Sequence, residues 1–234
     1  MKIVKIRESQ KSRLFEAYRE GFSFEELSSL SSDGNAQFEY CRKWLGEPDG
    51  SGSSRCVFTL SDNIILKLAM GKMRECGIAQ NLNEFKVFNA IKSPLLARLY
   101  DVDDNFTYLV CESVLPCEES DFEEVLGMPF YNKNDIFVNH DNPCVYDILC
   151  YIESCYVFDE GTMDKKAESI INNNAWFKEL CRVVREARIG DFCDYGNFGL
   201  VNRNGTPSIV LLDSGLNLDI WNEYYDNEDE YGSY

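Results

Sequence analysis

The sequence has little of what most metal and redox sites need. Its 234 residues include one histidine, His140, and its ten cysteines form no Cys-x-x-Cys pair. A zinc finger or a histidine-rich catalytic metal centre is therefore not expected. A Cys–His nucleophilic pair stays open, although residues 138–143 (VNHDNP) have the composition of a polar turn. Since no secretory leader is evident, we expect most cysteines to be small buried residues in a reducing cytosol.

Long apolar runs and positive charge are also scarce. No run approaches the roughly 18 apolar residues of a membrane span. The chain carries 23 Lys and Arg against 40 Asp and Glu, a formal charge of −17. This balance argues against direct binding to nucleic-acid backbones or anionic membranes, which need clustered basic residues. Residues 204–234 hold no Lys or Arg, so we expect the acidic tail (219–234) to be solvated or to attract a basic partner protein.

The patterning predicts a globular α+β protein, consistent with 44% hydrophobic and 13% aromatic residues. Residues 1–45 form a predicted N-terminal helical extension with helices at 9–19 and 36–45. Residues 46–116 predict a small antiparallel sheet covered by one helix: strands 55–60 and 64–69, helix 78–91, strands 99–102 and 106–110. Residues 117–218 predict helices at 121–126, 145–157, 163–171 and 175–187, then strands at 198–201 and 208–212.

A glycine- and serine-rich loop precedes the first predicted strand. Gly50 and Gly52 remove side chains where backbone N–H groups would approach phosphate oxygens, and Ser53 and Ser54 could add hydroxyl donors. Such runs are usually linkers. This one leads directly into a strand, which favours a phosphate-binding loop.

Lys67 lies in the apolar run 64–69 (IILKLA). Most lysines in strands face water. One framed so closely by apolar residues can instead point into a cleft and hold phosphates, provided that an acidic partner fixes its direction. Glu84, on the following predicted helix, is the candidate partner.

Three polar residues near the C-terminus have the chemistry of a magnesium site. Asp191 follows the most regular predicted helix, Asn197 begins a predicted strand, and Asp213 ends the next one. Amide and carboxylate oxygens are hard ligands suited to Mg²⁺ that is shared with phosphates. Each residue taken alone could equally form an Asx turn. As an ordered set they favour a metal and phosphate site.

Taken in order, these residues resemble the protein-kinase-like fold, which includes eukaryotic-type kinases and bacterial aminoglycoside and lipopolysaccharide kinases. The segment Gly50-x-Gly52-x-x-Arg55-x-Val57 is similar to the glycine-rich loop, with arginine in place of the third glycine. Residues 65–67 (ILK) resemble the strand that bears the phosphate-binding lysine, and Glu84 resembles its helix partner.

The second half of the resemblance follows downstream. Residues 108–116 (YLVCESVLP) are similar to the strand and hinge that hold adenine, with 112–114 as the hinge. Residues 191–199 resemble the catalytic loop, and 212–215 (LDSG) the metal-binding Asp-Phe-Gly motif. The resemblance covers roughly residues 46 to 216. It implies a two-lobed fold with a small antiparallel N-lobe sheet plus one helix, and a reduced, mostly helical C-lobe.

By this resemblance the cofactors are ATP and Mg²⁺, and Lys67 contacts the α- and β-phosphates. Asn197 and Asp213 would hold the metal, and Asp191 would orient the acceptor hydroxyl. The implied ATP site comprises Gly50, Gly52, Ser53, Ser54, Val57, Lys67, Glu84, Glu112 and Val114.

The sequence departs from the family at the catalytic base. The family spacing is Asp-x-x-x-x-Asn, whereas one extra residue separates Asp191 from Asn197. The family position falls on Phe192, which cannot act as a base. Either the loop bulges and Asp191 serves, or Asp194 has taken the role, or catalysis is lost. No Ala-Pro-Glu motif is present, and the short stretch after Gly215 makes a conventional platform for protein substrates doubtful.

Three functions follow from these observations. The first is an ATP- and Mg²⁺-dependent phosphotransferase acting on Ser, Thr or Tyr of a protein. The alternative is a catalytically inactive kinase-like module that binds a partner protein through its acidic surface. A third is an acidic decoy that mimics nucleic acid. A compact chain rich in Cys and Asn also suits a viral or mobile-element protein in a host cytoplasm.

Overall fold

The computed structural model describes residues 21–131, 143–161, 164–190, 192–203 and 205–225. The chain divides into two compact units. The sheet unit comprises Met1–Phe85 and Arg98–Ser113, and the helical unit comprises Lys86–Ala97 and Val114–Tyr234. Both contain antiparallel strands and helices, which confirms the predicted α+β class. The predicted domain limits at residues 46, 117 and 219 stay predictions.

The sheet unit is built on a five-stranded antiparallel sheet with the order β1-β2-β3-β5-β4. Its strands are β1 (Gly50–Ser51), β2 (Arg55–Ser61), β3 (Ile64–Ala69), β4 (Leu99–Val102) and β5 (Tyr108–Glu112). The two predicted hairpins are therefore present. In addition, the glycine-rich segment is itself a strand, because Gly50 pairs with Val57 and Ser51 with Cys56.

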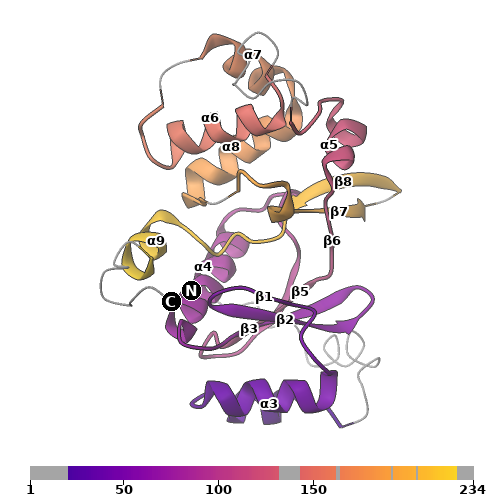
Figure 1. The fold of residues 1–234 in the computed structure, drawn as a ribbon, viewed down its shortest axis with the longest axis vertical. Helices are drawn as coiled ribbons and strands as arrows, with labels where there is room; N and C mark the ends of the chain where they lie inside the picture. The colour runs from indigo at the N-terminus through magenta and orange to yellow at the C-terminus, as the bar shows by residue number, and fades with distance from the viewer. Residues whose placement is uncertain (1–20, 132–142, 162–163, 191, 204, 226–234) are drawn as a thin grey trace. The chain divides into compact units, whose positions relative to one another are not determined.

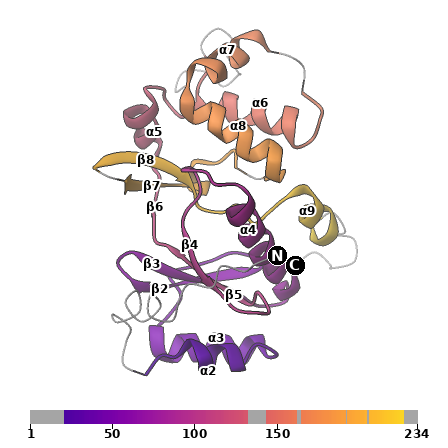
Figure 2. The same cartoon turned by 180° about the vertical axis from the view of Figure 1, so that it is seen from behind.

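Helices cover both faces of this sheet (Figures 1 and 2). Alternate residues of β3, such as Leu66 and Leu68, are fully buried in one cluster with residues of α2 (Phe24–Ser29) and α3 (Gly34–Leu45). The opposite face meets α4 (Arg74–Ala90). Patterning predicts one covering helix and the structure has three, because α2 and α3 from the predicted extension belong to the same core. The predicted helix at 9–19 lies outside the described residues.

A buried polar network fastens α3 to the sheet. The Gln37 amide donates to the Thr107 hydroxyl at 2.8 Å, and that hydroxyl donates to Asp103 at 2.8 Å. Asp103 also accepts the Tyr108 backbone N–H at 3.0 Å. Arg74 donates to the Ser31 carbonyl and to Gln37, which ties the start of α4 to the same network. Buried polar groups paired in this way fix one arrangement of neighbouring elements.

The helical unit packs its helices and a three-stranded antiparallel sheet around a second core (Figure 1). Its elements are β6 (Leu115–Pro116), α5 (Glu119–Leu126), α6 (Val145–Tyr156), α7 (Lys165–Asn173), α8 (Ala175–Ala187), the 3₁₀ turn η1 (Tyr195–Asn197), β7 (Phe198–Arg203), β8 (Thr206–Leu211) and α9 (Leu218–Tyr224). An aromatic cluster containing Phe122, Phe130, Trp176 and Phe198 lies at its centre.

Helix α8 confirms its predicted bounds, and its termini explain them. Asn174 caps the start by accepting the backbone N–H groups of Trp176 and Phe177. Arg188 ends the helix in the left-handed conformation at φ 51°. Strands β7 and β8 run further than predicted, since pairing continues to Arg203 and Thr206.

The cysteines follow the sequence-based expectation. All ten are free thiols; seven are buried, and Cys150, Cys155 and Cys193 are half-buried. Among the described residues, no helix has the length and apolar character needed to cross a bilayer.

Candidate functional site

The first part of the candidate site is the β1–β2 hairpin of the sheet unit. The loop closes through the Gly52 N–H, which donates to the Arg55 carbonyl at 2.8 Å. Gly50, Gly52 and Ser53 are exposed. A Cβ added at Gly50 would meet no described atom within 4 Å. Packing within the chain therefore does not require glycine at this position, which leaves close approach of a ligand as a reason for it.

The neighbouring residues Ser53 and Ser54 differ in exposure to solvent. Ser54 is buried, and its hydroxyl donates to the Gln80 side chain on α4 at 3.2 Å. Its carbonyl accepts the Met70 N–H at 2.9 Å. Ser54 thus fastens the start of β2 to α4, whereas Ser53 stays on the exposed loop.

Lys67 and Glu84 form the centre of the site in the sheet unit. The Lys67 ammonium donates to both carboxylate oxygens of Glu84, at 2.8 and 3.1 Å. Both side chains are more than nine-tenths buried. The structure therefore contains the ion pair that the sequence predicts, although binding of a nucleotide to it stays a prediction.

Arg55 also contacts this carboxylate. Its Nη1 lies 3.0 Å from Glu84 Oε2 and 3.1 Å from Asn81 Oδ1. The Asn81 amide donates in turn to the Phe106 carbonyl at 2.8 Å. The sequence analysis noted Arg55 only as a departure from glycine. A signal was present in the spacing, because Asn81 and Glu84, three residues apart, share one face of a helix.

Gly77 lets α4 lie this close to the sheet. A Cβ at Gly77 would overlap the Ser54 carbonyl oxygen and lie 2.9 Å from the Ala69 Cβ. The next turns of the helix carry Gln80, Asn81 and Glu84. Close backbone approach therefore brings these polar side chains within reach of β2 and β3.

The residues of the predicted adenine site, Val57, Glu112 and Val114, lie in different segments of the chain. Val57 pairs with Lys67 across β2 and β3, so the two side chains share a face of the sheet. The Glu112 carboxylate accepts the Arg98 N–H at 3.0 Å, and the Glu112 N–H donates to the Arg98 carbonyl at 2.8 Å. Val114 is half-buried and is the first residue of the helical unit after the chain leaves the sheet unit.

In the helical unit, the backbone brings the two predicted metal ligands together. The Leu212 N–H donates to the Asn197 carbonyl at 3.0 Å, which places Asn197 beside the segment that carries Asp213. Asn197 ends the 3₁₀ turn η1 instead of beginning a strand, because Asp194 caps that turn. Asp213 follows β8 and accepts the Gly215 N–H at 2.9 Å. This bond is the Asx turn that the sequence left open.

The predicted catalytic base is the least defined part of the site. Asp191 lies outside the described residues. Asp194 is exposed, and its carboxylate accepts the Gly196 N–H at 2.7 Å. Phe192, which holds the family's base position, is fully buried in the core. His140 also lies outside the described residues.

A thiol cluster lies beside this loop. The Cys193 thiol donates to the Glu153 carboxylate at 3.1 Å and also lies within hydrogen-bonding reach of Cys150. That second bond lowers the pKa of Cys150 to about 7, against the opposing effect of burial. The sequence analysis missed this pair because Cys150 and Cys193 come from distant segments.

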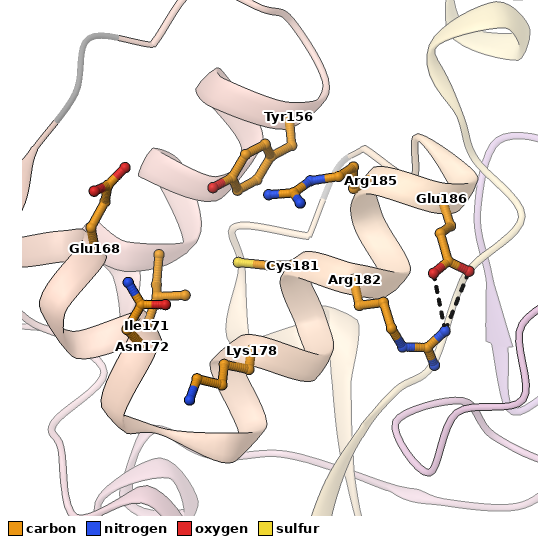
Figure 3. A pocket seen from close by; sticks show the side chains of 9 residues that line it. All are labelled: Tyr156, Glu168, Ile171, Asn172, Lys178, Cys181, Arg182, Arg185 and Glu186. Atoms are coloured by element: carbon orange, nitrogen blue, oxygen red, sulfur yellow. Dashed lines mark hydrogen bonds and ion pairs between the residues drawn. The ribbon is translucent and has the colours of Figure 1, made fainter.

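The helical unit also contains a groove of about 350 Å³ between α6, α7 and α8 (Figure 3). The Arg185 guanidinium lies 4.4 Å from the centre of the Tyr156 ring, and Arg182 pairs with Glu186 at 3.2 Å. None of the described residues that line the groove belongs to the predicted nucleotide site. Within the described part of the chain, no group of three or more His, Cys, Asp or Glu is arranged to hold a metal ion.

Comparison with known proteins adds little to this geometry. No family model matches the sequence, and no curated protein is detectably similar to it. Solved structures similar to the chain include a SAICAR synthase from Saccharomyces cerevisiae in complex with SAICAR. It is 12% identical over 74% of each chain, with a TM-score of 0.35. A likeness of this degree is too slight to assign a fold or a function.

Proposed function

We propose that the protein is an ATP- and Mg²⁺-dependent phosphotransferase of the protein-kinase-like class that acts on a hydroxyl group of Ser, Thr or Tyr. Residues 46–116 and 117–218 would form its two lobes, with 219–234 as an acidic tail. It would work in the cytoplasm, of a host cell if the protein is viral. The buried ion pair of Lys67 with Glu84 carries this proposal.

A lysine in this setting is suited to phosphate. Burying an ammonium group is costly unless a partner compensates it, and the Glu84 carboxylate supplies that compensation at 2.8 Å. The pair fixes the direction of the ammonium group, so little ordering would remain when a phosphate binds. The exposed Gly50 and Gly52 would let a phosphate come close to the backbone of this hairpin, where the Gly52 N–H already donates to the Arg55 carbonyl. Val57, Glu112 and Val114 would contact the adenine.

The polar residues of the helical unit fit a hard cation. The Asp213 carboxylate and the Asn197 side-chain oxygen are both ligand types that Mg²⁺ accepts. The Asp213 carboxylate also accepts the Gly215 N–H at 2.9 Å, which helps to fix its direction. Bound Mg²⁺ would neutralise phosphate charge, which is most of what phosphoryl transfer requires. Asp191, or Asp194 in its place, would accept the hydroxyl proton.

The test is phosphate transfer from labelled ATP in the presence of Mg²⁺ and host lysate. We expect labelling of the protein itself or of a lysate protein by the wild type, and its loss in Asp213→Ala. Asp219→Ala, which changes an exposed acidic residue on α9, is the matched control and should retain transfer. Equal labelling by wild type and Asp213→Ala would contradict the proposal.

A specific observation favours the alternative, a catalytically inactive kinase-like module. At the described positions of the loop, Phe192 is buried and the Asp194 carboxylate caps η1. Such a module would bind a basic partner protein through its acidic surface. Partner capture that survives both Lys67→Ala and Asp213→Ala, without any phosphate transfer, would support it. Capture that depends on either residue would count against it.

A further inference from the structure

Arg55 occupies an unusual place in the sheet unit. It begins β2 opposite Ala69, so its side chain shares a face of the sheet with Val57 and Lys67. Only 7% of its surface is exposed. The similar glycine-rich loops carry their third glycine here, where a side chain is absent. In this chain the position instead supplies a buried cation directed at α4.

One carboxylate receives both cations. Glu84 Oε2 accepts from Arg55 Nη1 at 3.0 Å and from Lys67 Nζ at 3.1 Å. Its Oε1 accepts from Lys67 at 2.8 Å. Because the cations come from two neighbouring strands, the carboxylate is held from two directions. A glutamate held by one flexible lysine alone could change rotamer together with it.

The environment of Arg55 is itself fixed. Asn81, which has no exposed surface, donates its amide N–H to the Phe106 carbonyl at 2.8 Å. Its side-chain oxygen is thereby directed at Arg55. The guanidinium cannot lose its proton at any ordinary pH. Arg55 thus presents a permanent, rigidly placed charge to Glu84.

We propose that Arg55 is a positioning residue of the Lys67 site. It holds the Glu84 carboxylate, and through it the Lys67 ammonium, in one orientation for a phosphate of the bound nucleotide. This inference rests on the proposed function as far as the nucleotide is concerned. The effect of Arg55 on the orientation of the Lys67 ammonium does not depend on the proposed function.

The experiment uses the full chain with Arg55→Met, Arg55→Lys and a matched control, Arg74→Met. Arg74 is also a largely buried arginine that ties α4 to its surroundings, through Ser31 and Gln37, without touching Glu84. The first readout is the NMR signal of the Lys67 ammonium group, which persists only where the group is held and shielded from water. The second is the Kd for Mg²⁺-ATP.

Arg55→Met should broaden or shift the Lys67 signal and raise the Kd about tenfold. A lysine at position 55 keeps the positive charge but has a shorter and more flexible side chain without the planar guanidinium, so Arg55→Lys should give an intermediate effect. Arg74→Met should lower the melting temperature and leave both readouts unchanged.

Two results separate the claims. If the wild type binds no ATP but its Lys67 signal depends on Arg55, the positioning role stands and the proposed function fails. A wild-type Lys67 signal in Arg55→Met, or an equal disturbance in Arg74→Met, would overturn the positioning role. The melting temperature shows whether Arg55→Met is folded. If Arg55→Met is unfolded, the Lys67 signal of Arg55→Lys decides whether the positioning role holds.

Discussion

The two units hold their candidate functional residues in opposite ways. In the sheet unit, Arg55, Lys67 and Glu84 are buried and joined by bonds between two strands and a helix. In the helical unit, Asp194 and Asp213 are more accessible, and each bonds to an N–H two residues further on. The first arrangement depends on packing between strands and a helix, whereas the second includes bonds within local turns. The candidate nucleotide residues are therefore built into the core, and the candidate metal and base residues are carried on loops.

From this contrast we expect the largest loss in the free energy of unfolding when Glu84 is substituted. Glu84→Ala removes the carboxylate that two buried cations contact, and loss of one partner of a buried ion pair typically costs about 3–5 kcal/mol. Asp213→Ala removes a half-buried carboxylate that accepts the Gly215 N–H, and we expect it to cost less, about 1–2 kcal/mol. Urea unfolding of both variants measures the difference. Equal losses of stability would show that the two sites are held alike.

The next largest loss of stability is expected for substitution of Gly77. Gly77→Ala would push α4 away from the Ser54 carbonyl, and overpacking of this kind costs about 1–3 kcal/mol, more than the gain of about 1 kcal/mol in helix propensity. Gly50→Ala is the matched control, because a Cβ there meets no described atom within 4 Å. It should change the free energy of unfolding by less than about 0.5 kcal/mol. Urea unfolding measures the stability of both variants. An unchanged free energy of unfolding in Gly77→Ala would contradict the close approach of α4 to the sheet.

Substitution of the candidate metal residues Asn197 and Asp213 should change how strongly Mg²⁺ enhances ATP binding, with little change in the fold. We expect Mg²⁺ to strengthen ATP binding, and this enhancement to fall about tenfold in Asp213→Ala and less in Asn197→Ala. Titration calorimetry with and without Mg²⁺ measures it. An enhancement unchanged in both variants would remove these residues from the metal site.

Cys150 provides the smallest and most local test. Its pKa of about 7 predicts that alkylation rises through pH 7 and levels off above it, because the thiolate is the reactive form. The buried Cys41 and Cys56, whose pKa burial raises to about 12, should stay unreacted across this range. Peptide mapping after brief iodoacetamide treatment compares them. Cys193→Ala removes the hydrogen bond that lowers the Cys150 pKa, so alkylation of Cys150 should move to higher pH, and an unaltered profile would exclude the thiol pair.

The success of sequence reasoning depended on the range of the interactions. Helix α8 could be predicted because its apolar face, its cap at Asn174 and its stop at Arg188 are all local signals. The Lys67–Glu84 pair could be proposed because a strand and the next helix are neighbours in sequence. The role of Arg55 is harder to predict, because its partner is 29 residues away and the signals are a missing glycine and the shared helix face of Asn81 and Glu84.

The same limit explains the remaining differences. Residues 24–29 lack a long periodic pattern, and α2 is stabilised by packing of Leu27 into the core of the sheet unit. Asn197 was assigned to a strand because the following residues are apolar. Its actual conformation depends on the Asp194 cap. Caps and tertiary contacts of this kind override the local preference of a short segment.

The most direct test of the account is titration of Mg²⁺-ATP into the wild type and into Lys67→Met. We predict binding by the wild type, and an affinity at least tenfold lower in the variant, a loss of about 1.4 kcal/mol. A thermal-shift assay should agree, since ATP at about 100 times its Kd stabilises the fold by roughly 2.7 kcal/mol. Absence of binding by the folded wild type, or equal affinity in Lys67→Met, would contradict a nucleotide site at Lys67.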